Sequence, residues 1–456
     1  MPPHHPARDD ETADGEIDRT FDVAVIGGGS AATTLVAEVA AAGCRVVVFE
    51  PGRVGGECPF VACMPTKSML CDVAGRRSWG HAIRRRSDVV EHLDDSPHVL
   101  DLQRHGAVLV RASARLAGDG AIDADGQRYA ARHVVLATGS EPIVPPIAGL
   151  DDLGDRRWTS ADAMVVEERP TRLTIVGGGV IGCELATIFA GFGTEVHVLD
   201  TNPQAFAHLP GEIGRILDDA LGVAGVRVRR GVTIDRVDRR GGGVRTTLGN
   251  GAIVDTDRIL VAAGTRPRTA DLGLETVGLN GEDGLVVGLD GRVAGHQSLW
   301  AIGDVAGHGE YTHLANHQAH VVADALVGDG TRRFDDVVLP ACVFTTPPIV
   351  SIGARPEDTP PGASVWVDAR LREVPRATTD ELGDGFLAIG VDRSTHAVVG
   401  AHGIGARFDE LAAALVTAID GRIPVEQLAR SMWPFPTVGE ILGLVYSRAA
   451  SSLSES

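Results

Sequence analysis

A strand, a glycine-rich turn, a helix, a second strand and a closing acid occur twice in this chain of 456 residues. In the first copy the β-branched segment 21–26 leads into Gly-Gly-Gly-Ser-Ala-Ala at 27–32. An alanine-rich helix and a strand over 45–49 follow, and the strand ends at Glu50. Glycines at such a turn let the backbone approach a pyrophosphate at the helix N-terminus, and the acid accepts a ribose hydroxyl. The first copy therefore predicts a dinucleotide site.

The second copy repeats this order with a strand over 173–176, glycines within 177–182, a helix to Phe192 and a strand over 195–199 ending at Asp200. Each copy is followed by a hairpin-like β region and a matching strand, HVVLATG over 133–139 and RILVAAG over 258–264. Self-similarity of this kind indicates two homologous nucleotide-binding domains of the α/β class.

Two cysteines separated by four residues, Cys58 and Cys63, lie within the first copy in a glycine- and proline-punctuated segment just downstream of its glycine turn. On a regular helix, five steps of about 100° leave the side chains about 140° apart, too far round for a disulfide. Pro59 and Pro65 predict the required distortion, because proline suits a first helical turn and lacks the amide for an internal bond. The spacing favours a redox pair. The alternatives are core packing or half of a zinc site, which would need further ligands at short spacing.

Length and charge limit the possible functions. The chain is too long for one core, and 42 Lys+Arg against 61 Asp+Glu give a net charge of -19, which argues against nucleic-acid binding. No apolar run has membrane-spanning length, and residues 1–20 lack the apolar core of a signal peptide. We therefore expect a soluble cytoplasmic protein with a disordered tail over 1–20. The other cysteines are expected to pack as small apolar residues; they are Cys44, Cys71, Cys183 and Cys342.

The segment GGECPFVACMPTK over 55–67 resembles the redox-disulfide motif GGxCxxxGCxPxK of the flavin-dependent pyridine nucleotide-disulfide reductases, such as dihydrolipoamide dehydrogenase, glutathione reductase and mercuric reductase. The resemblance extends over nearly all of the chain after about residue 20. It implies two Rossmann-like FAD- and NAD-binding domains plus a C-terminal α+β dimerisation domain. The expected boundaries are 21–154 for the FAD domain with the redox motif, 155–270 for the NAD(P) domain, 271–335 for completion of the FAD domain and 336–456 for the dimerisation domain.

The resemblance also implies ligands for the two nucleotides. LWAIGD over 299–304 matches the family's strand whose aspartate binds FAD, although a plain Gly-Asp turn is the alternative. The residues that follow predict a helix from about 312 to 327. The residues implied for FAD are Gly27, Gly29, Ser30, Ala31, Glu50, Gly56, Lys67, Thr138, Gly139, Asp304 and Thr312. Those implied for the nicotinamide nucleotide are Gly177, Gly179, Gly182, Asp200 and Gly264.

Asp200 bears on which nicotinamide nucleotide is used. A carboxylate there accepts from the 2′-hydroxyl of NADH and repels a 2′-phosphate. No arginine lies in the residues just after Asp200. We therefore expect NADH in preference to NADPH.

By resemblance, hydride passes from NADH to FAD, and the electrons then reduce the Cys58/Cys63 disulfide. Cys63 is the implied charge-transfer thiolate and Cys58 the thiol that exchanges with a small-molecule substrate. Lys67 would lie near the flavin and pair with Glu184; the alternative is that both are solvated helix residues. The family is homodimeric, and the C-terminal domain of one subunit completes the active site of the other.

The chain departs from the family at its C-terminal motif, where His-Pro-Thr-x-x-Glu becomes FPTVGE over 435–440. Glu440 is kept, but Phe435 replaces the histidine base, and loss of acid-base help slows thiol exchange by about two to four orders of magnitude. His313 is a candidate for a surrogate acid or a flavin hydrogen-bond partner, with a structural histidine as the alternative.

The acceptor stays open between a small disulfide, a quinone and a metal ion. Mercuric reductase also has an aromatic residue in this context, but its C-terminal cysteine pair and N-terminal metal-binding domain are not found here. A mercuric-reductase-like enzyme is therefore the first alternative. A flavoprotein redox sensor or binding module without turnover is the second.

Overall fold

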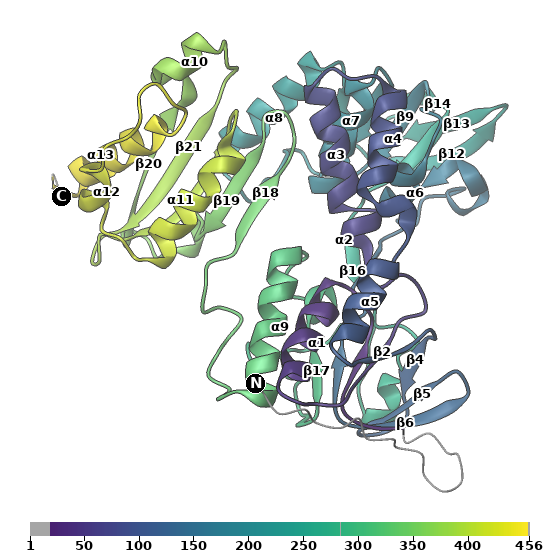
Figure 1. Cartoon of the computed structure of the whole chain (residues 1–456). Coiled ribbons are helices and arrows are strands. Elements are labelled where there is room, and N and C mark those ends of the chain that lie inside the picture. The colour runs from purple at the N-terminus through teal and green to yellow at the C-terminus, as the bar shows by residue number, and fades with distance from the viewer. Residues whose placement is uncertain (1–18, 283, 455–456) are drawn as a thin grey trace, which may run out of the picture. The chain divides into compact units, whose positions relative to one another are not determined.

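The computed structural model describes residues 19–282 and 284–454 (Figure 1). The expected tail over 1–20 therefore falls, up to residue 18, outside the described residues. The chain divides into two compact units. Unit 1 comprises the described residues up to Gly56 together with Asp94–Glu141 and Arg266–Phe334, and unit 2 comprises Glu57–Leu93, Pro142–Thr265 and Asp335–Ser456.

Unit 1 contains a 7-stranded sheet in which β17, β6, β1, β2 and β3 are parallel neighbours, and β5 and β4 extend it antiparallel. Valine-rich strands occupy its centre, and β1 is buried on both faces over most of its length, as a parallel strand requires. The bounds are β1 Thr20–Ile26, β2 Val46–Phe49, β3 Val108–Val110, β4 Ala114–Leu116, β5 Ala121–Ala124, β6 Gln127–Leu136 and β17 Leu299–Ala301.

Two helices lie side by side against this sheet, α1 (Ser30–Ala41) and α9 (Thr312–Val327) (Figure 1). Their small and branched side chains form one buried cluster with the sheet residues. The predicted first copy, the predicted strand before Asp304 and the helix over about 312–327 are therefore confirmed. A shorter helix, α5 (Ser96–Arg104), precedes β3.

Unit 2 contains the second copy as a 5-stranded parallel sheet in the order β11-β10-β9-β15-β8. Its strands are β8 Arg157–Trp158, β9 Arg172–Val176, β10 Glu195–Leu199, β11 Arg227–Arg229 and β15 Arg258–Val261. Helices α7 (Val180–Gly191) and α8 (Gly211–Val223) pack on it. The predicted second copy is confirmed.

The C-terminal part of unit 2 is a 5-stranded antiparallel sheet in the order β18-β19-β22-β21-β20, with helices packed against it. This confirms the predicted α+β architecture of the C-terminal domain. The bounds are β18 Pro340–Val343, β19 Ile349–Gly353, β20 Ser364–Arg370, β21 Phe386–Asp392, β22 Val398–Ile404, α10 Pro375–Thr379, α11 Phe408–Asp420, α12 Val425–Ala429 and α13 Glu440–Ser454.

The remaining elements are short or connect these layers. They are α2 Glu57–Phe60, α3 Cys63–Ala74, α4 Trp79–Val89, α6 Ser160–Val165, β7 Ser140–Pro142, β12 Ile234–Arg240, β13 Gly243–Leu248, β14 Ile253–Thr256, β16 Thr265–Pro267, η1 Glu91–Leu93, η2 Asp151–Arg156, η3 Leu274–Val277, η4 Gly303–Ala306, η5 Pro356–Asp358 and η6 Leu371–Glu373.

The segment 57–93, which the sequence assigns to the first nucleotide-binding domain, packs with the second copy. Met69 of α3 is fully buried in one cluster with Cys183 and Phe189 of α7. A Cβ on Gly191 of α7 would meet Val73 Cγ1 at 2.3 Å, so α3 lies directly on that glycine. Helix α3 is therefore fixed to the second copy by close packing.

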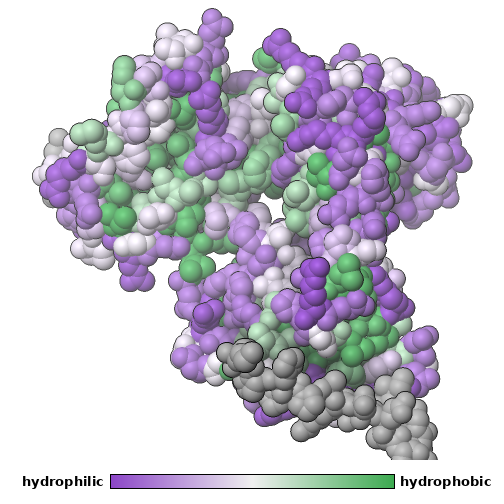
Figure 2. All heavy atoms as spheres, viewed as in Figure 1, coloured by the Kyte–Doolittle hydropathy of each residue, from purple (hydrophilic) through white to green (hydrophobic). Residues whose placement is uncertain are grey.

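Polar contacts fix α3 to α4 as well. The fully buried carboxylate of Asp72 on α3 accepts from Arg85 Nη1 at 3.3 Å, and Arg77 Nη1 lies 3.6 Å from the same oxygen. Figure 2 shows a mostly hydrophilic surface over these two helices, where Arg76, Arg77 and Arg84 are exposed. The arginines of this segment thus form a solvated surface, and some of them also anchor the helix that carries Cys63.

The prediction for the four other cysteines is only partly right. Cys183 is buried, and Cys44 and Cys342 are half-buried. Cys71 is exposed because it lies on the solvent side of α3, and for this residue the prediction is wrong. Among the described residues, no helix is both long and apolar enough to cross a bilayer.

We predict that Gly182→Ala destabilises unit 2, because a Cβ there would lie 2.0 Å from the Gly177 carbonyl oxygen at the tight turn. Overpacking against the backbone lowers the free energy of unfolding by about 1–3 kcal/mol. Each kcal/mol lowers the melting temperature by about 2–4 °C. Gly222→Ala on α8 is the control, since nothing lies within 4 Å of its Cβ position. Thermal unfolding followed by circular dichroism should show a lower midpoint for the first variant only. Equal midpoints would contradict the close helix-strand approach.

Candidate functional site

The glycine turn of the first copy forms an open cradle at the start of α1. Gly27 has φ 108°, and a Cβ there would lie 2.2 Å from the Ala137 carbonyl oxygen, so only glycine permits this approach. Gly29 is the N-cap of α1 with no side-chain cap, and only Gly56 Cα, at 3.9 Å, lies near its Cβ position. The first amides of the helix, contributed by Ser30 and Ala31, are thus left for an anion.

Glu50 closes this cradle at the end of β2. Its Oε2 accepts from the Gly28 amide at 2.7 Å, and its Oε1 accepts from the Gly52 amide at 2.6 Å. The carboxylate is half-buried, which leaves it accessible to a ribose hydroxyl. The cradle and this acid together fit the adenosine half of FAD.

Asp304 lies in η4, directly after β17, and accepts from the Ser140 hydroxyl at 2.8 Å. Burial raises the pKa of its carboxyl group above the usual value. The preceding Gly303 amide donates to Gln318 Oε1 on α9 at 2.7 Å, which ties η4 to that helix. The Gln318 amide nitrogen is buried and has no partner among the described residues. A buried donor of this kind calls for an acceptor, such as a bound cofactor would supply.

The other residues expected around FAD lie at the edges of this region. Ser30 on α1 donates to Asn316 of α9 at 2.6 Å, close to the α9 start at Thr312. Thr138 donates to the Arg268 carbonyl oxygen at 2.7 Å, and nothing lies within 4 Å of the Cβ position of Gly139, which has φ 72°.

The cysteine segment folds as two helices with a break between them. Cys58 is the second residue of α2, and Cys63 is the first residue of α3. Between them the Val61 and Ala62 amides both donate to the Glu57 carbonyl oxygen, at 2.8 and 3.0 Å, and Ala62 has φ -128° and ψ -100°. The predicted distortion of the helix is confirmed. Cys63 thus lies at a helix N-terminus, where unpaired amides favour a thiolate.

Lys67 and Glu184 are brought together, one turn after Cys63. Lys67 Nζ lies 2.8 Å from Glu184 Oε2, and the two side chains are 35% and 5% exposed. Glu184 Oε1 accepts from the Phe344 amide at 2.9 Å, and the Phe344 ring lies 4.8 Å from Lys67 Nζ. The alternative of two solvated helix residues does not hold for this chain. Phe344, which follows β18, was not singled out by the sequence because its contribution is a backbone amide.

The glycine turn of the second copy repeats the first. Gly177 has φ 104°, and a Cβ would lie 2.2 Å from the Ala262 carbonyl oxygen. Gly179 is the N-cap of α7 with no side-chain cap, and nothing lies within 4 Å of its Cβ position. Gly264 has φ 103° and follows β15. The open helix start fits a second pyrophosphate.

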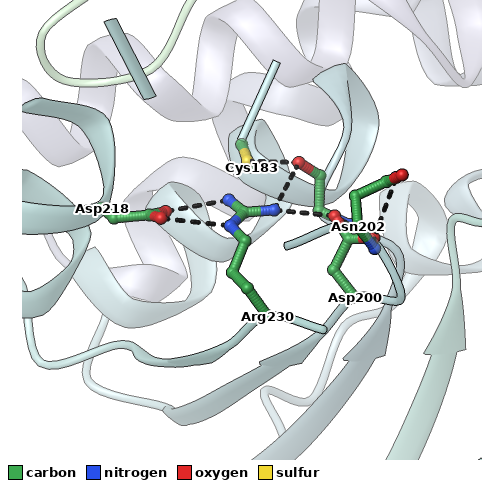
Figure 3. A network of polar contacts seen from close by, with 6 residues as sticks. Cys183, Asp200, Asn202, Asp218 and Arg230 are labelled. Atoms are coloured by element: carbon green, nitrogen blue, oxygen red, sulfur yellow. Dashed lines mark hydrogen bonds and ion pairs between the residues drawn. The ribbon is translucent and has the colours of Figure 1, made fainter. Parts of the chain in front are cut away.

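Asp200 directly follows the second strand of the second copy, and its carboxylate forms an ion pair. Arg230, directly after β11, places Nη1 2.7 Å from Asp200 Oδ2 (Figure 3). Arg230 comes 30 residues after Asp200 and therefore lies outside the residues just after Asp200 from which the NADH preference was predicted. No residue next to Asp200 in the sequence signals this contact, because it arises from the pairing of β10 with β11.

The C-terminal motif is a local turn at the start of α13. Glu440 Oε2 accepts from the Thr437 amide at 3.1 Å, and Phe435 is 74% exposed. The ring of His313 lies 5.4 Å from the ring of Tyr311 at the start of α9. Within the described residues, no group of three or more His, Cys, Asp and Glu side chains is arranged to hold a metal ion.

We predict that Glu184→Ala destabilises the protein by about 2–4 kcal/mol, because it leaves Lys67 and the Phe344 amide without a partner in a mostly buried site. Glu184→Gln is the matched control, since its carbonyl oxygen still accepts from Phe344, and about half of that loss is expected. Urea unfolding followed by tryptophan fluorescence measures both. An equal loss in the two variants would show that the amide bond contributes little.

Comparisons with known proteins agree with this architecture. The chain matches the family model described as pyridine nucleotide-disulphide oxidoreductase over residues 21–319, and the model of that family's dimerisation domain over 339–445. It is 26% identical to a mercuric reductase of Staphylococcus aureus over 471 residues, covering 98% of this chain and 86% of the relative. It is 29% identical to a dihydrolipoyl dehydrogenase of Pseudomonas aeruginosa over 451 residues, covering 91% and 94%. The solved structure of the HOCl-induced flavoprotein disulfide reductase RclA from Escherichia coli has a TM-score of 0.87 at 27% identity, covering 94% of this chain and 99% of that one.

Proposed function

Because this chain belongs to the pyridine nucleotide-disulphide oxidoreductase family, we propose that it is an FAD-dependent oxidoreductase with a redox-active Cys58/Cys63 pair. It takes electrons from a nicotinamide nucleotide and delivers them to a small acceptor. The observation that carries the proposal is the break between α2 and α3. That break makes Cys63 the first residue of a helix whose Lys67 is held by the mostly buried Glu184.

FAD, when bound, accepts a hydride and releases the two electrons to a disulfide. The chain's own residues bind and orient the nucleotides. The open helix starts at Gly29 and Gly179 receive the two pyrophosphates, and Glu50 receives the ribose in the first copy. The bond from Ser140 and the tie from Gly303 to Gln318 hold Asp304 in place.

The two cysteines carry the electrons onward. Two electrons and two protons convert their disulfide into two thiols, and oxidation by the acceptor restores the disulfide. Cys63 takes the thiolate role because of its helix N-terminus, and Cys58 exchanges with the acceptor. Lys67 contributes a fixed positive charge, which stabilises negative charge that develops nearby during reduction. Glu184 fixes the position of that charge.

The choice of electron acceptor depends on Phe435, which replaces the histidine base of the family. Phe435 cannot transfer a proton, so turnover of disulfides that need acid-base help is slow. A soft metal ion bound by thiolates needs no such proton relay. The mercuric reductases among the relatives, and the solved Cu(II) complex of RclA at 26% identity, favour metal reduction as the second candidate. Quinones stay a further candidate acceptor.

We also propose a homodimer that shares its active sites, supported by the match to the dimerisation-domain model and by the antiparallel sheet at the C-terminus. Glu440 is then the C-terminal residue proposed to act in the partner's site. A cytoplasmic location is proposed because the nicotinamide reductant is found there.

We expect the purified protein to be yellow, and titration with NADH under argon to produce a long-wavelength charge-transfer absorption. Cys63→Ser should abolish this band and Cys58→Ser should keep it, because only the Cys63 thiolate is proposed to give rise to it. The matched control is Cys71→Ser, since Cys71 is exposed on the same helix. A colourless protein that takes up no FAD, or a spectrum unaffected by either active-site variant, would overturn the proposed function.

We expect Phe435→His to raise NADH-dependent reduction of a small aromatic disulfide by at least about tenfold, because acid-base help contributes about 10²–10⁴-fold to such steps. The ring is largely exposed, so the change should not disturb the core. Phe435→Leu is the control and should stay at the original rate. Rates with Hg(II), Cu(II) and a quinone, measured in parallel, should not rise in the histidine variant. A disulfide rate that also stays flat would show that the base does not limit exchange.

A further inference from the structure

Arg230 joins the acid of the second copy to helix α8 (Figure 3). Its Nε and Nη2 donate to the two oxygens of Asp218, at 3.1 and 2.8 Å, so the guanidinium is held in a fork. Its Nη1 donates to Asp200 Oδ2 at 2.7 Å and lies 3.3 Å from the Gly178 carbonyl oxygen. The Arg230 side chain is only 8% exposed, so its position is fixed.

Asp200 is already fully hydrogen-bonded. Its Oδ2 accepts from Arg230 and from the Gly178 amide at 3.2 Å, and its Oδ1 accepts from Asn202 N at 2.9 Å and Asn202 Nδ2 at 3.2 Å. A carboxylate offers about four acceptor positions. Its side chain is also only 8% exposed. Asp200 is therefore neither a free acceptor for a ribose hydroxyl nor an unpaired negative charge.

The first copy provides an internal comparison. Arg111 follows β3 as Arg230 follows β11, but it bonds to the Gly52 carbonyl oxygen and pairs with Asp95 at 2.6 Å. The corresponding acid, Glu50, accepts from the Gly28 and Gly52 amides and is half-buried. The first copy thus leaves the carboxylate of Glu50 accessible, whereas the second copy pairs Asp200 with an arginine.

Space for this arrangement comes from Gly178. A Cβ there would lie 2.3 Å from Arg230 Nη1 and 2.7 Å from Asp200 Oδ2. At the corresponding Gly28 a Cβ would instead meet Glu50 Cβ and Cγ at 2.9 Å. Glycine at the second position of the second turn therefore admits a guanidinium above the turn.

We infer that Arg230 determines nucleotide specificity, by offsetting the charge of Asp200 so that the second copy accepts a 2′-phosphate as well as a 2′-hydroxyl. This inference rests on the proposed function, since it assigns the second copy to a nicotinamide nucleotide. It replaces the expectation of NADH preference, which treated Asp200 as a lone acid. Asp218 bonds to the opposite edge of the guanidinium and is 32% exposed, so water screens its charge more strongly than that of Asp200.

The test is a binding titration of the purified FAD-loaded protein with NADP⁺ and with NAD⁺, followed by calorimetry, so that no electron acceptor is involved. We expect the two dissociation constants of the unaltered protein to lie within about tenfold of each other, a difference of about 1.4 kcal/mol or less. Arg230→Gln should weaken the binding of NADP⁺ by at least about tenfold relative to the binding of NAD⁺, because Asp200 then faces the 2′-phosphate without a counter-charge.

Two further variants make the result decisive. Arg227→Gln is the matched control, because Arg227 lies on β11, the strand that precedes Arg230, but pairs with Glu195 and is 61% exposed. The ratio of the NADP⁺ and NAD⁺ dissociation constants should not change in this variant. Asp200→Asn should move the ratio toward NADP⁺ and serves as the test if Arg230→Gln does not fold. Unaltered protein that rejects NADP⁺, or an unchanged ratio in both the Arg230 and Asp200 variants, would overturn the inference alone. Failure to bind either nucleotide would overturn the proposed function as well.

Discussion

The ion pair between Lys67 and Glu184 connects three parts of unit 2 that are far apart in sequence. Lys67 belongs to the helix that begins at Cys63, Glu184 belongs to the first helix of the second copy, and the Phe344 amide follows the first strand of the C-terminal sheet. Because both carboxylate oxygens of Glu184 are used, the cysteine helix, the nucleotide fold and the C-terminal sheet are held by one side chain. Removing one partner of a buried pair is far more damaging than the net strength of the pair suggests.

Much of the fold could be predicted because its evidence is local. The strand 195–199 was expected with the bounds that β10 has, and the helix expected over about 312–327 is α9. The broken helix was also predictable, since two prolines and the stereochemistry of a disulfide both oppose a regular helix over 58–65. Each of these inferences uses residues that are neighbours in sequence.

The rest depended on contacts that sequence order does not reveal. Arg230 reaches Asp200 only because two parallel strands end side by side, and no local pattern marks that pairing. Packing of segment 57–93 on the second copy depends on Val73 meeting the bare backbone of Gly191. The exposure of Cys71 depends on which face of α3 that packing covers. Side-chain identity in such places is set by tertiary neighbours.

The contact between Val73 and Gly191 limits how nucleotide-binding folds can be exchanged between members of this family. Helix α3 packs so closely on Gly191 that it cannot slide without a clash. The cysteine segment and the second nucleotide-binding fold therefore form one packed unit, although they are separate segments of the chain. A chimera that exchanges nucleotide folds between relatives should therefore carry residues 57–93 together with 142–265. A splice that follows linear order would separate surfaces shaped for each other.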